Sequence, residues 1–278
     1  MMKKTISIFA VMLIIFTACS SNETESFSEK KKIVTFSVKG NFEVDELAPF
    51  TRSLTSEGKE MTDIWVIDTD GDGSILQTVH QQKTDSKFGS PALALSYGSH
   101  VLYFCASRGM TPTLNGTILR WEKVLDTFWA KKALTIDNET AESQSVELER
   151  IVTRLKVTVL DGVPSGAKSF NVIMRLVKEI DLRTGLGTME EGTVPFAMTK
   201  EDEGKTGIEY GVFSLCPSLE EWKVDVSMRY DNNEAETVID VPFVMNRETK
   251  MKGNMNSIDE GFTITLNTTW DQAVEKDF

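Results

Sequence analysis

The chain of 278 residues has few of the side chains that enzymes use as bases and metal ligands. It contains two histidines, His80 and His100, and three cysteines. It has no Walker loop, no G-x-S-x-G elbow and no H-E-x-x-H motif, and neither histidine stands at metal-ligand spacing from a cysteine or carboxylate. We therefore expect no enzyme activity, no catalytic, metal-binding or cofactor-binding residues, and no cofactor. A hydrolase would require one histidine to meet an orienting carboxylate and a nucleophile in the fold.

Positive charge and cysteine are also scarce. The sequence holds 30 basic and 42 acidic residues, which gives a formal net charge of −12. The phosphates of nucleic acids would repel such a chain, so we expect no nucleic-acid partner. Three cysteines do not make a disulfide scaffold. Cys105 and Cys216 lie in apolar, strand-like runs where free thiols pack as small hydrophobes, although a bridge between them stays open.

Long apolar runs are missing except near the N-terminus, where residues 8–16 are uninterrupted by polar side chains. Nine residues are too few to span a bilayer, but they are typical of a signal peptide, and Lys3 and Lys4 precede them. The small Ala18 before Cys19 resembles a bacterial lipobox, in which the Cys19 thiol would carry palmitate and other acyl chains. An ordinary secretory signal with a chance cysteine is the alternative. Either way, the mature chain leaves the cytoplasm.

Alternating apolar and polar residues dominate the rest of the chain, most clearly at 222–230. Many short strands separated by turn residues predict β-sandwiches. Residues 91–97 and 100–106 are expected to pair with each other across Gly98 and Ser99. One segment departs from the pattern, because its apolar residues recur every three to four positions and predict an amphipathic helix at 117–132. These residues are Leu114, Ile118, Trp121, Leu125 and Phe128.

We predict an all-β protein with two β-sandwich domains and one short helix. The signal peptide covers 1–18, a flexible tether 19–32, the N-terminal sandwich 33–148 and the C-terminal sandwich 149–278. Removal of the signal peptide leaves 260 residues with a formal charge of −14, because two lysines leave with it. A chain of that length suffices for two ordinary domains.

An acidic turn and the five tryptophans are candidate binding features. Asp68, Asp70, Asp72 and Gly73 imitate the first half of an EF-hand loop, but Val79 stands where calcium needs a bidentate carboxylate. We therefore expect a hairpin turn with solvated aspartates, with weak surface calcium binding as the alternative. Most of the tryptophans follow strand or helix periodicity, which favours core packing over stacking on sugars.

Arg52 is the candidate processing residue. It lies in the segment LAPFTRSLTSEG, between the first predicted strand and the second. A loop that contains proline and glycine is where proteases cut. Taken alone, an ordinary exposed arginine is the better explanation of this residue.

The order of these features resembles the fimbrillin family, whose members are lipoprotein-precursor subunits and anchors of type V pili. The matching features run in order along the chain: the lipobox, the first strand at 33–44, PFTRS, DIWVIDTDGDGSIL, SYGSHVLYFCAS, LERIVTRLKV, VPFVMNRETKMKGN and a last strand that ends at Trp270. The resemblance implies two transthyretin-like β-sandwich domains, a structural and adhesive role, and export to the outer membrane through lipid on Cys19. It also implies that a trypsin-like protease cuts after Arg52, so that the first strand leaves and a strand from a neighbouring subunit replaces it.

The resemblance leaves two functions open. A cleaved chain would be a shaft or tip subunit of a fimbria, and its donor strand would come from 262–278, a run that could equally be an internal strand of the second domain. An uncleaved chain would be a fimbrial anchor, or a lipid-tethered adhesin for glycans or host ligands. The expected partners are other fimbrial subunits, the outer membrane and a host or bacterial surface receptor.

Overall fold

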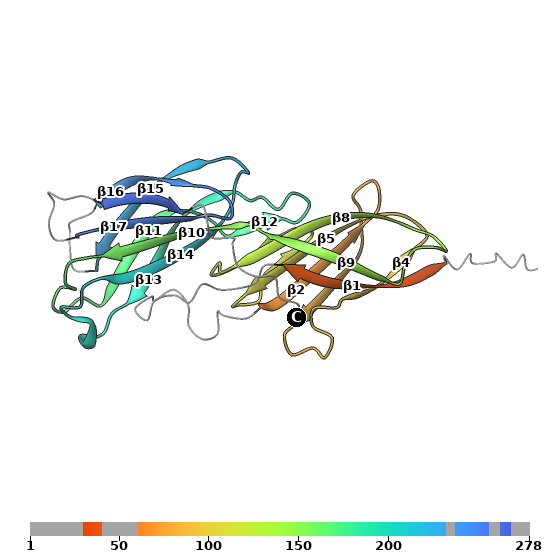
Figure 1. Cartoon of the computed structure of the whole chain (residues 1–278), viewed down its shortest axis with the longest axis horizontal. Helices are drawn as coiled ribbons and strands as arrows, with labels where there is room; N and C mark the ends of the chain where they lie inside the picture. The colour runs from red at the N-terminus through yellow and green to blue at the C-terminus, as the bar shows by residue number, and fades with distance from the viewer. Residues whose placement is uncertain (1–29, 41–60, 232–236, 256–261, 268–278) are drawn as a thin grey trace, which may run out of the picture.

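A computed structural model describes residues 30–40, 61–231, 237–255 and 262–267 (Figure 1). The signal peptide, Cys19 and Arg52 lie outside these residues. Among the described residues, all regular structure is β-strand except one 3-10 turn, η2 (Lys200–Asp202), which confirms the all-β prediction. Within these ranges, no helix has the length and apolar character needed to cross a membrane.

The N-terminal half forms one seven-stranded sheet. Its strands are β1 (Lys31–Gly40), β2 (Met61–Thr69), β3 (Ile75–Gln82), β4 (Ala92–Ser96), β5 (Gly98–Arg108), β8 (Thr127–Ile136) and β9 (Ser143–Arg150). They lie in the order β3-β2-β5-β8-β9-β1-β4, and β1 is parallel to β9. Strands β8 and β9 pair at only two positions, so the sheet bends there and places β9, β1 and β4 over β2, β5 and β8 (Figure 1). Buried residues from both layers form the core between them.

The C-terminal half contains two four-stranded sheets. One has the order β14-β10-β17-β18, with β10 (Val152–Val159), β14 (Ile208–Leu215), β17 (Glu248–Gly253) and β18 (Phe262–Asn267). The other has the order β13-β11-β15-β16, with β11 (Ser169–Val177), β13 (Met189–Ala197), β15 (Trp222–Tyr230) and β16 (Thr237–Phe243). The predicted alternation at 222–230 is confirmed, because Val224, Val226 and Tyr230 point into the core between the sheets.

The predicted helix at 117–132 is wrong. Residues 118–120 form β7 (Ile118–Arg120), which pairs with β6 (Thr113–Asn115) across a turn where Gly116 has φ +61°. From Thr127 onward the chain is β8, which pairs with β5 over ten positions. The helical spacing of apolar residues arises because Trp121 and Leu125 both face a core shared by the two halves. Tertiary contacts therefore override the local period.

A small fourth sheet joins strands of the two halves. Strand β12 (Glu179–Asp181) pairs with β7, in the order β12-β7-β6. The indole N–H of Trp129 donates to the carbonyl oxygen of Leu182 at 2.7 Å. A buried cluster with members such as Tyr103 and Phe213 fills the space beside it. The predicted domain boundary at 148/149 stays a prediction, and only Ile151 separates β9 from β10 there.

The predicted pairing of 91–97 with 100–106 is also wrong. Strand β4 pairs with β1, and β5 pairs with β2 and β8. Gly98 has φ +127°, a conformation that side chains disfavour, and it turns the chain from one layer of the sandwich into the other. The hairpin signal at Gly98 therefore marks a corner between layers.

Candidate functional site

The N-terminal strand β1 is the candidate functional site, because it lies inside the sheet between two other strands. Its first half, Lys31 to Thr35, pairs with β4 in antiparallel register, and its second half, Thr35 to Gly40, pairs with β9 in parallel register. The backbone N–H groups of Phe36 and Val38 donate to carbonyl oxygens at 2.9 and 3.0 Å in the segment before β4. Both backbone edges of β1 are therefore engaged.

One face of β1 packs into the sandwich core. Val34, Phe36 and Val38 are 0%, 0% and 2% exposed, whereas Ile33 on the opposite face is 67% exposed. The Phe36 ring lies 5.2 Å from the ring of Phe104, at an interplanar angle of 58°. At about 2 kcal/mol for each buried side chain, the three core residues contribute roughly 6 kcal/mol of burial free energy. The predicted first strand at 33–44 is confirmed as far as Gly40, and residues 41–44 lie outside the described residues.

Polar contacts fix the start of β1 at the end of the sandwich remote from the C-terminal half (Figure 1). The Lys30 ammonium donates to Asn138 Oδ1 at 2.9 Å, and the Lys32 ammonium donates to the backbone carbonyl of Asn138 at 3.0 Å. Hydrogen bonds from Thr140 hold the pKa of the Asp137 carboxyl in the same turn below its usual range. Strand β1 therefore begins at this end of the sandwich.

The C-terminal run 262–267, a predicted donor or internal strand, is paired inside the second half. Strand β18 forms six antiparallel residue pairs with β17, from Glu248↔Asn267 to Gly253↔Phe262. It lies at the edge of its sheet. A donor role for this run would require these six pairs to separate, and residues 268–278 lie outside the described structure.

Each histidine meets a buried aspartate on β2, which the sequence analysis missed. His80 Nε2 lies 2.8 Å from Asp63 Oδ1, and the His80 ring stacks on Trp65 with 3.9 Å between ring centroids. His100 Nδ1 lies 2.7 Å from Asp68 Oδ1. The partners are 17 and 32 residues apart in sequence, so no local spacing reveals them. The available signal was a pair of aspartates within an otherwise apolar strand, where buried charges require partners.

The surroundings of His100 resemble a Ser–His–Asp triad only in outline. The Ser96 hydroxyl lies 3.3 Å from His100 Nε2, but the Ser96 carbonyl oxygen lies closer, at 2.9 Å. A carbonyl oxygen only accepts hydrogen bonds, so its partners assign a proton to Nε2. A general base must instead offer an unprotonated nitrogen to the serine. This arrangement therefore suits a structural link between strands.

The acidic turn forms the predicted hairpin, with one correction. The Asp70 carboxylate accepts hydrogen bonds from the backbone N–H groups of Asp72 and Ser74 at 3.0 and 2.8 Å, and Gly73 has φ +84°. The interpretation of Asp68 as a solvated aspartate is wrong, because it is fully buried in β2. No group of three or more His, Cys, Asp or Glu side chains in the described part of the chain could hold a metal ion.

The cysteines and tryptophans occupy packing positions. Cys105 and Cys216 are free and buried, and burial raises the pKa of both thiols. Of the tryptophans in the described residues, Trp121 is fully buried, and the other three are half-buried. Trp270 lies outside the described residues. None of the described tryptophans is among the exposed large hydrophobic residues, which agrees with the prediction of core packing.

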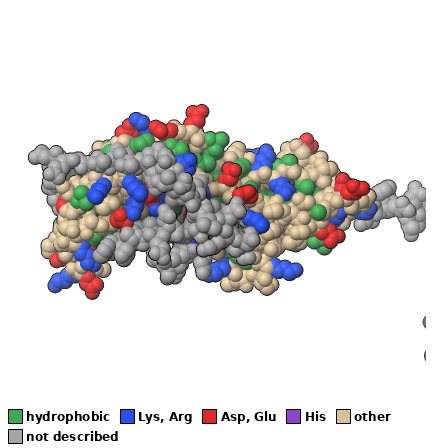
Figure 2. All heavy atoms as spheres, viewed as in Figure 1, with side chains coloured by type: hydrophobic (Ala, Val, Ile, Leu, Met, Phe, Trp, Pro, Cys, Tyr) green, Lys and Arg blue, Asp and Glu red, His purple; other side chains and the backbone are tan. Residues whose placement is uncertain are grey.

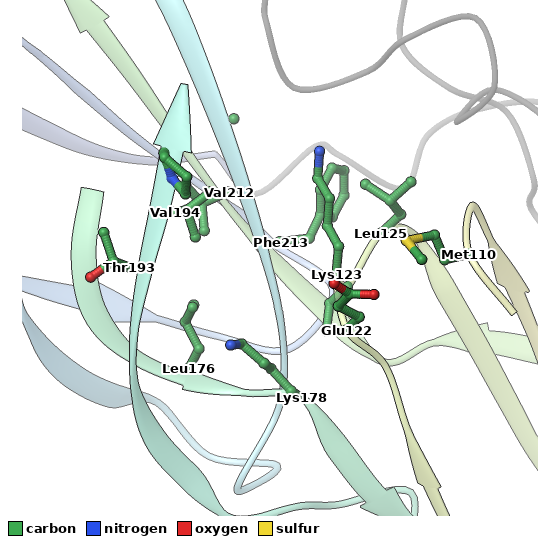
Figure 3. A pocket seen from close by; sticks show the side chains of 13 residues that line it. Met110, Glu122, Lys123, Leu125, Leu176, Lys178, Thr193, Val194, Val212 and Phe213 are labelled. Atoms are coloured by element: carbon green, nitrogen blue, oxygen red, sulfur yellow. The ribbon is translucent and has the colours of Figure 1, made fainter. Parts of the chain in front are cut away.

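A cavity of about 330 Å³ lies at the junction of the two halves (Figure 3). Leu125 and Lys123 line one side with Phe213 beside them, and Leu176 and Val212 line the other. The lining contains neither histidine nor cysteine.

On the face shown in Figure 2, acidic and basic side chains of the described residues are interspersed, which is not the concentrated basic surface that nucleic-acid binding requires.

The fold and these sites define an all-β protein whose N-terminal strand lies between two strands of its own sheet. The chain belongs to the family of fimbrillin-A associated anchor proteins Mfa1 and Mfa2, whose model matches residues 111–275. The predicted resemblance to fimbrial proteins is thereby confirmed. No curated protein matches the sequence.

Solved structures share the fold at low sequence identity. A candidate polysaccharide-binding protein from Bacteroides thetaiotaomicron is 7% identical with a TM-score of 0.54, and the match covers 89% of this chain and 98% of that one. A candidate adhesin from the same organism is 9% identical with a TM-score of 0.52, over 86% and 98% of the two chains. The fimbrial anchor protein Mfa2 from Porphyromonas gingivalis is 10% identical with a TM-score of 0.50, over 86% and 98%.

Proposed function

We propose that this protein is a subunit of a cell-surface fimbria, exported as a lipoprotein through Cys19 and assembled by exchange of β-strands. In this proposal, cleavage after Arg52 frees β1, and a strand from a neighbouring subunit takes its place. The observation that carries the proposal is the position of β1 between β4 and β9, with Val34, Phe36 and Val38 in the core. Membership of a family of fimbrial anchor proteins supports the same role.

The physics of the exchange follows from the two neighbours of β1. Its departure would leave unpaired N–H and C=O groups on β4 and β9 and an apolar trough between them. An incoming extended segment with alternating apolar residues would satisfy both, which is β-strand addition. Because donor and acceptor are different surfaces, such contacts are head-to-tail and generate filaments.

A second form of the function, favoured by the family match, is an uncleaved anchor. In this form β1 stays in place, and lipid on Cys19 holds the fold to the outer membrane. The twelve residues from Cys19 to Lys30 are joined by eleven Cα–Cα steps and span at most about 40 Å when extended, which sets how far the fold can stand from the membrane surface. In both forms the role is structural, and membership of a family of fimbrial anchor proteins supports a protein without enzyme activity.

The N-terminal residue of the protein isolated from cell-surface filaments distinguishes the two forms. Cleavage gives Ser53 as the first residue, whereas an anchor begins at an acylated Cys19. Arg52→Ala is the matched variant, since it should leave a cleaved subunit uncut and stop its assembly. Cys19→Ala should abolish labelling by radioactive palmitate. Absence of the protein from filaments and from surface fractions would refute the proposal.

A further inference from the structure

Strand β4 depends on β1 more than any other strand in its sheet does. In the described residues its one strand partner is β1, and it lies at the end of the sheet order. Leu93 and Leu95 bury their side chains in the core, at 1% and 0% exposure. If β1 leaves during exchange, β4 loses every ladder hydrogen bond, and one wall of the trough loses its support.

Two side chains, His100 and Gln77, form hydrogen bonds with backbone carbonyl groups of β4, and a third, Asp68, holds both of them. Asp68 on β2 binds His100 on β5, and His100 Nε2 donates to the Ser96 carbonyl of β4 at 2.9 Å. Gln77 on β3 donates to Asp68 Oδ2 at 3.0 Å and to the Ala94 carbonyl of β4 at 3.2 Å. We call Asp68, Gln77 and His100 the β4 clasp. It reaches Ala94 and Ser96, two of the residues that β1 pairs with.

The clasp is built from rigid parts. Asp68 is 0% exposed and His100 is 3% exposed, so the hydrogen bond between them is shielded from solvent. Asp68 pairs with Leu102 of β5 and Gln77 of β3 in the ladder, which fixes its backbone independently of β1. The clasp atoms therefore keep their positions when β1 is absent.

We propose that the β4 clasp holds β4 in place after β1 departs, so that the open trough keeps two walls spaced for an incoming strand. This inference rests on the proposed strand exchange. Asp68 and His100 act as positioning residues in it, because His100 contacts the β4 backbone and Asp68 holds His100 and Gln77 in place. The partner that the trough accepts is an extended segment whose alternate residues are apolar, as in β1.

The chain contains its own matched control. The Asp63–His80 pair also joins a fully buried aspartate on β2 to a histidine, at 2.8 Å, but it links β2 to β3 and does not touch β4. The test uses the chain 20–278 with a site-specific protease sequence placed between residues 45 and 59. After cutting, a fluorescent peptide of residues 30–40 replaces the nicked strand in urea below the unfolding transition, and anisotropy gives its Kd.

Asp68→Asn and His100→Gln should weaken peptide binding at least about tenfold, the effect expected from losing one hydrogen bond to a charged group. Asp63→Asn and His80→Gln should change the Kd less than about threefold. Cooperative unfolding of each uncut variant shows that it folds. Hydrogen exchange of β4 in the nicked chain should be faster only in the clasp variants.

Three possible results distinguish the role of the β4 clasp from strand exchange itself. Equal binding by clasp variants and wild type overturns the clasp and leaves strand exchange standing. Equal weakening by clasp and control variants also overturns the clasp, since the cause is then general destabilisation. If the nicked wild type takes up no peptide, strand exchange and the clasp are both wrong.

Discussion

Phe36→Ala gives the sharpest test of the β1 site. Phe36 is fully buried and contacts Phe104 across the core. Truncation of a buried phenylalanine costs about 3–5 kcal/mol, a range that includes the loss of contacts such as the ring pair with Phe104. Ile33→Ala on the same strand is the control, because Ile33 is 67% exposed and its truncation should cost less than about 0.5 kcal/mol.

The assay is urea unfolding of the uncut mature chain, followed by tryptophan fluorescence and circular dichroism. Phe36→Ala should lower the midpoint strongly with an unchanged m-value if the chain unfolds in one step. A selective loss of the N-terminal half in a separate transition would also agree with the packing, because the Phe36 contacts lie in that half's core. A Phe36→Ala protein as stable as Ile33→Ala would show that β1 is not seated as described and would refute the reasoning.

Two further predictions concern buried polar groups. Asp126→Ala should cost about 3–5 kcal/mol, because it removes the buried carboxylate that lies 2.8 Å from the buried Arg150 guanidinium. Asp240→Ala, which breaks an exposed pair with Lys223, should cost less than about 1 kcal/mol in the same urea assay. Burial and the charge of Asp161 raise the pKa of Tyr230 from 10.0 to about 12, so the folded state holds this proton more tightly than the unfolded state does. The contribution of Tyr230 to stability is therefore complete below pH 10 and declines as the pH rises toward 12, and Tyr230→Phe should show a smaller decline in the urea midpoint over that interval.

The sequence predicted the position of a strand correctly where apolar residues alternate with polar ones and one face of the strand packs into a core. Val34, Phe36 and Val38 alternate with exposed or half-buried residues, and the pleat of a strand converts this pattern directly into one buried face. The helix prediction at 117–132 failed for the complementary reason. Trp121 and Leu125 are buried by a core that two halves of the chain build together, and no local pattern encodes that surface.

The sequence predicted which strands pair with each other less well than it predicted where the strands lie along the chain. The turn at Gly98 indicated that β4 and β5 are neighbours, yet the chain turns there into another layer and β4 pairs with β1, about sixty residues earlier. The choice depends on which apolar faces meet in the core, which is a property of the whole sandwich. The same holds for Asp68 and His100, whose contact exists because β2 and β5 are adjacent.

The sequence by itself determined the all-β character of the chain and the resemblance to fimbrial proteins, and the export signal with lipid attachment at Cys19 stays a prediction from it. These properties depend on local composition and on a period that the backbone imposes on side chains. Tertiary structure alone decided that β1 lies between a parallel and an antiparallel neighbour, and that a buried Asp–His pair holds one of those neighbours from the other side. Such contacts join residues distant in sequence, so their energies act only when the complete sandwich has formed.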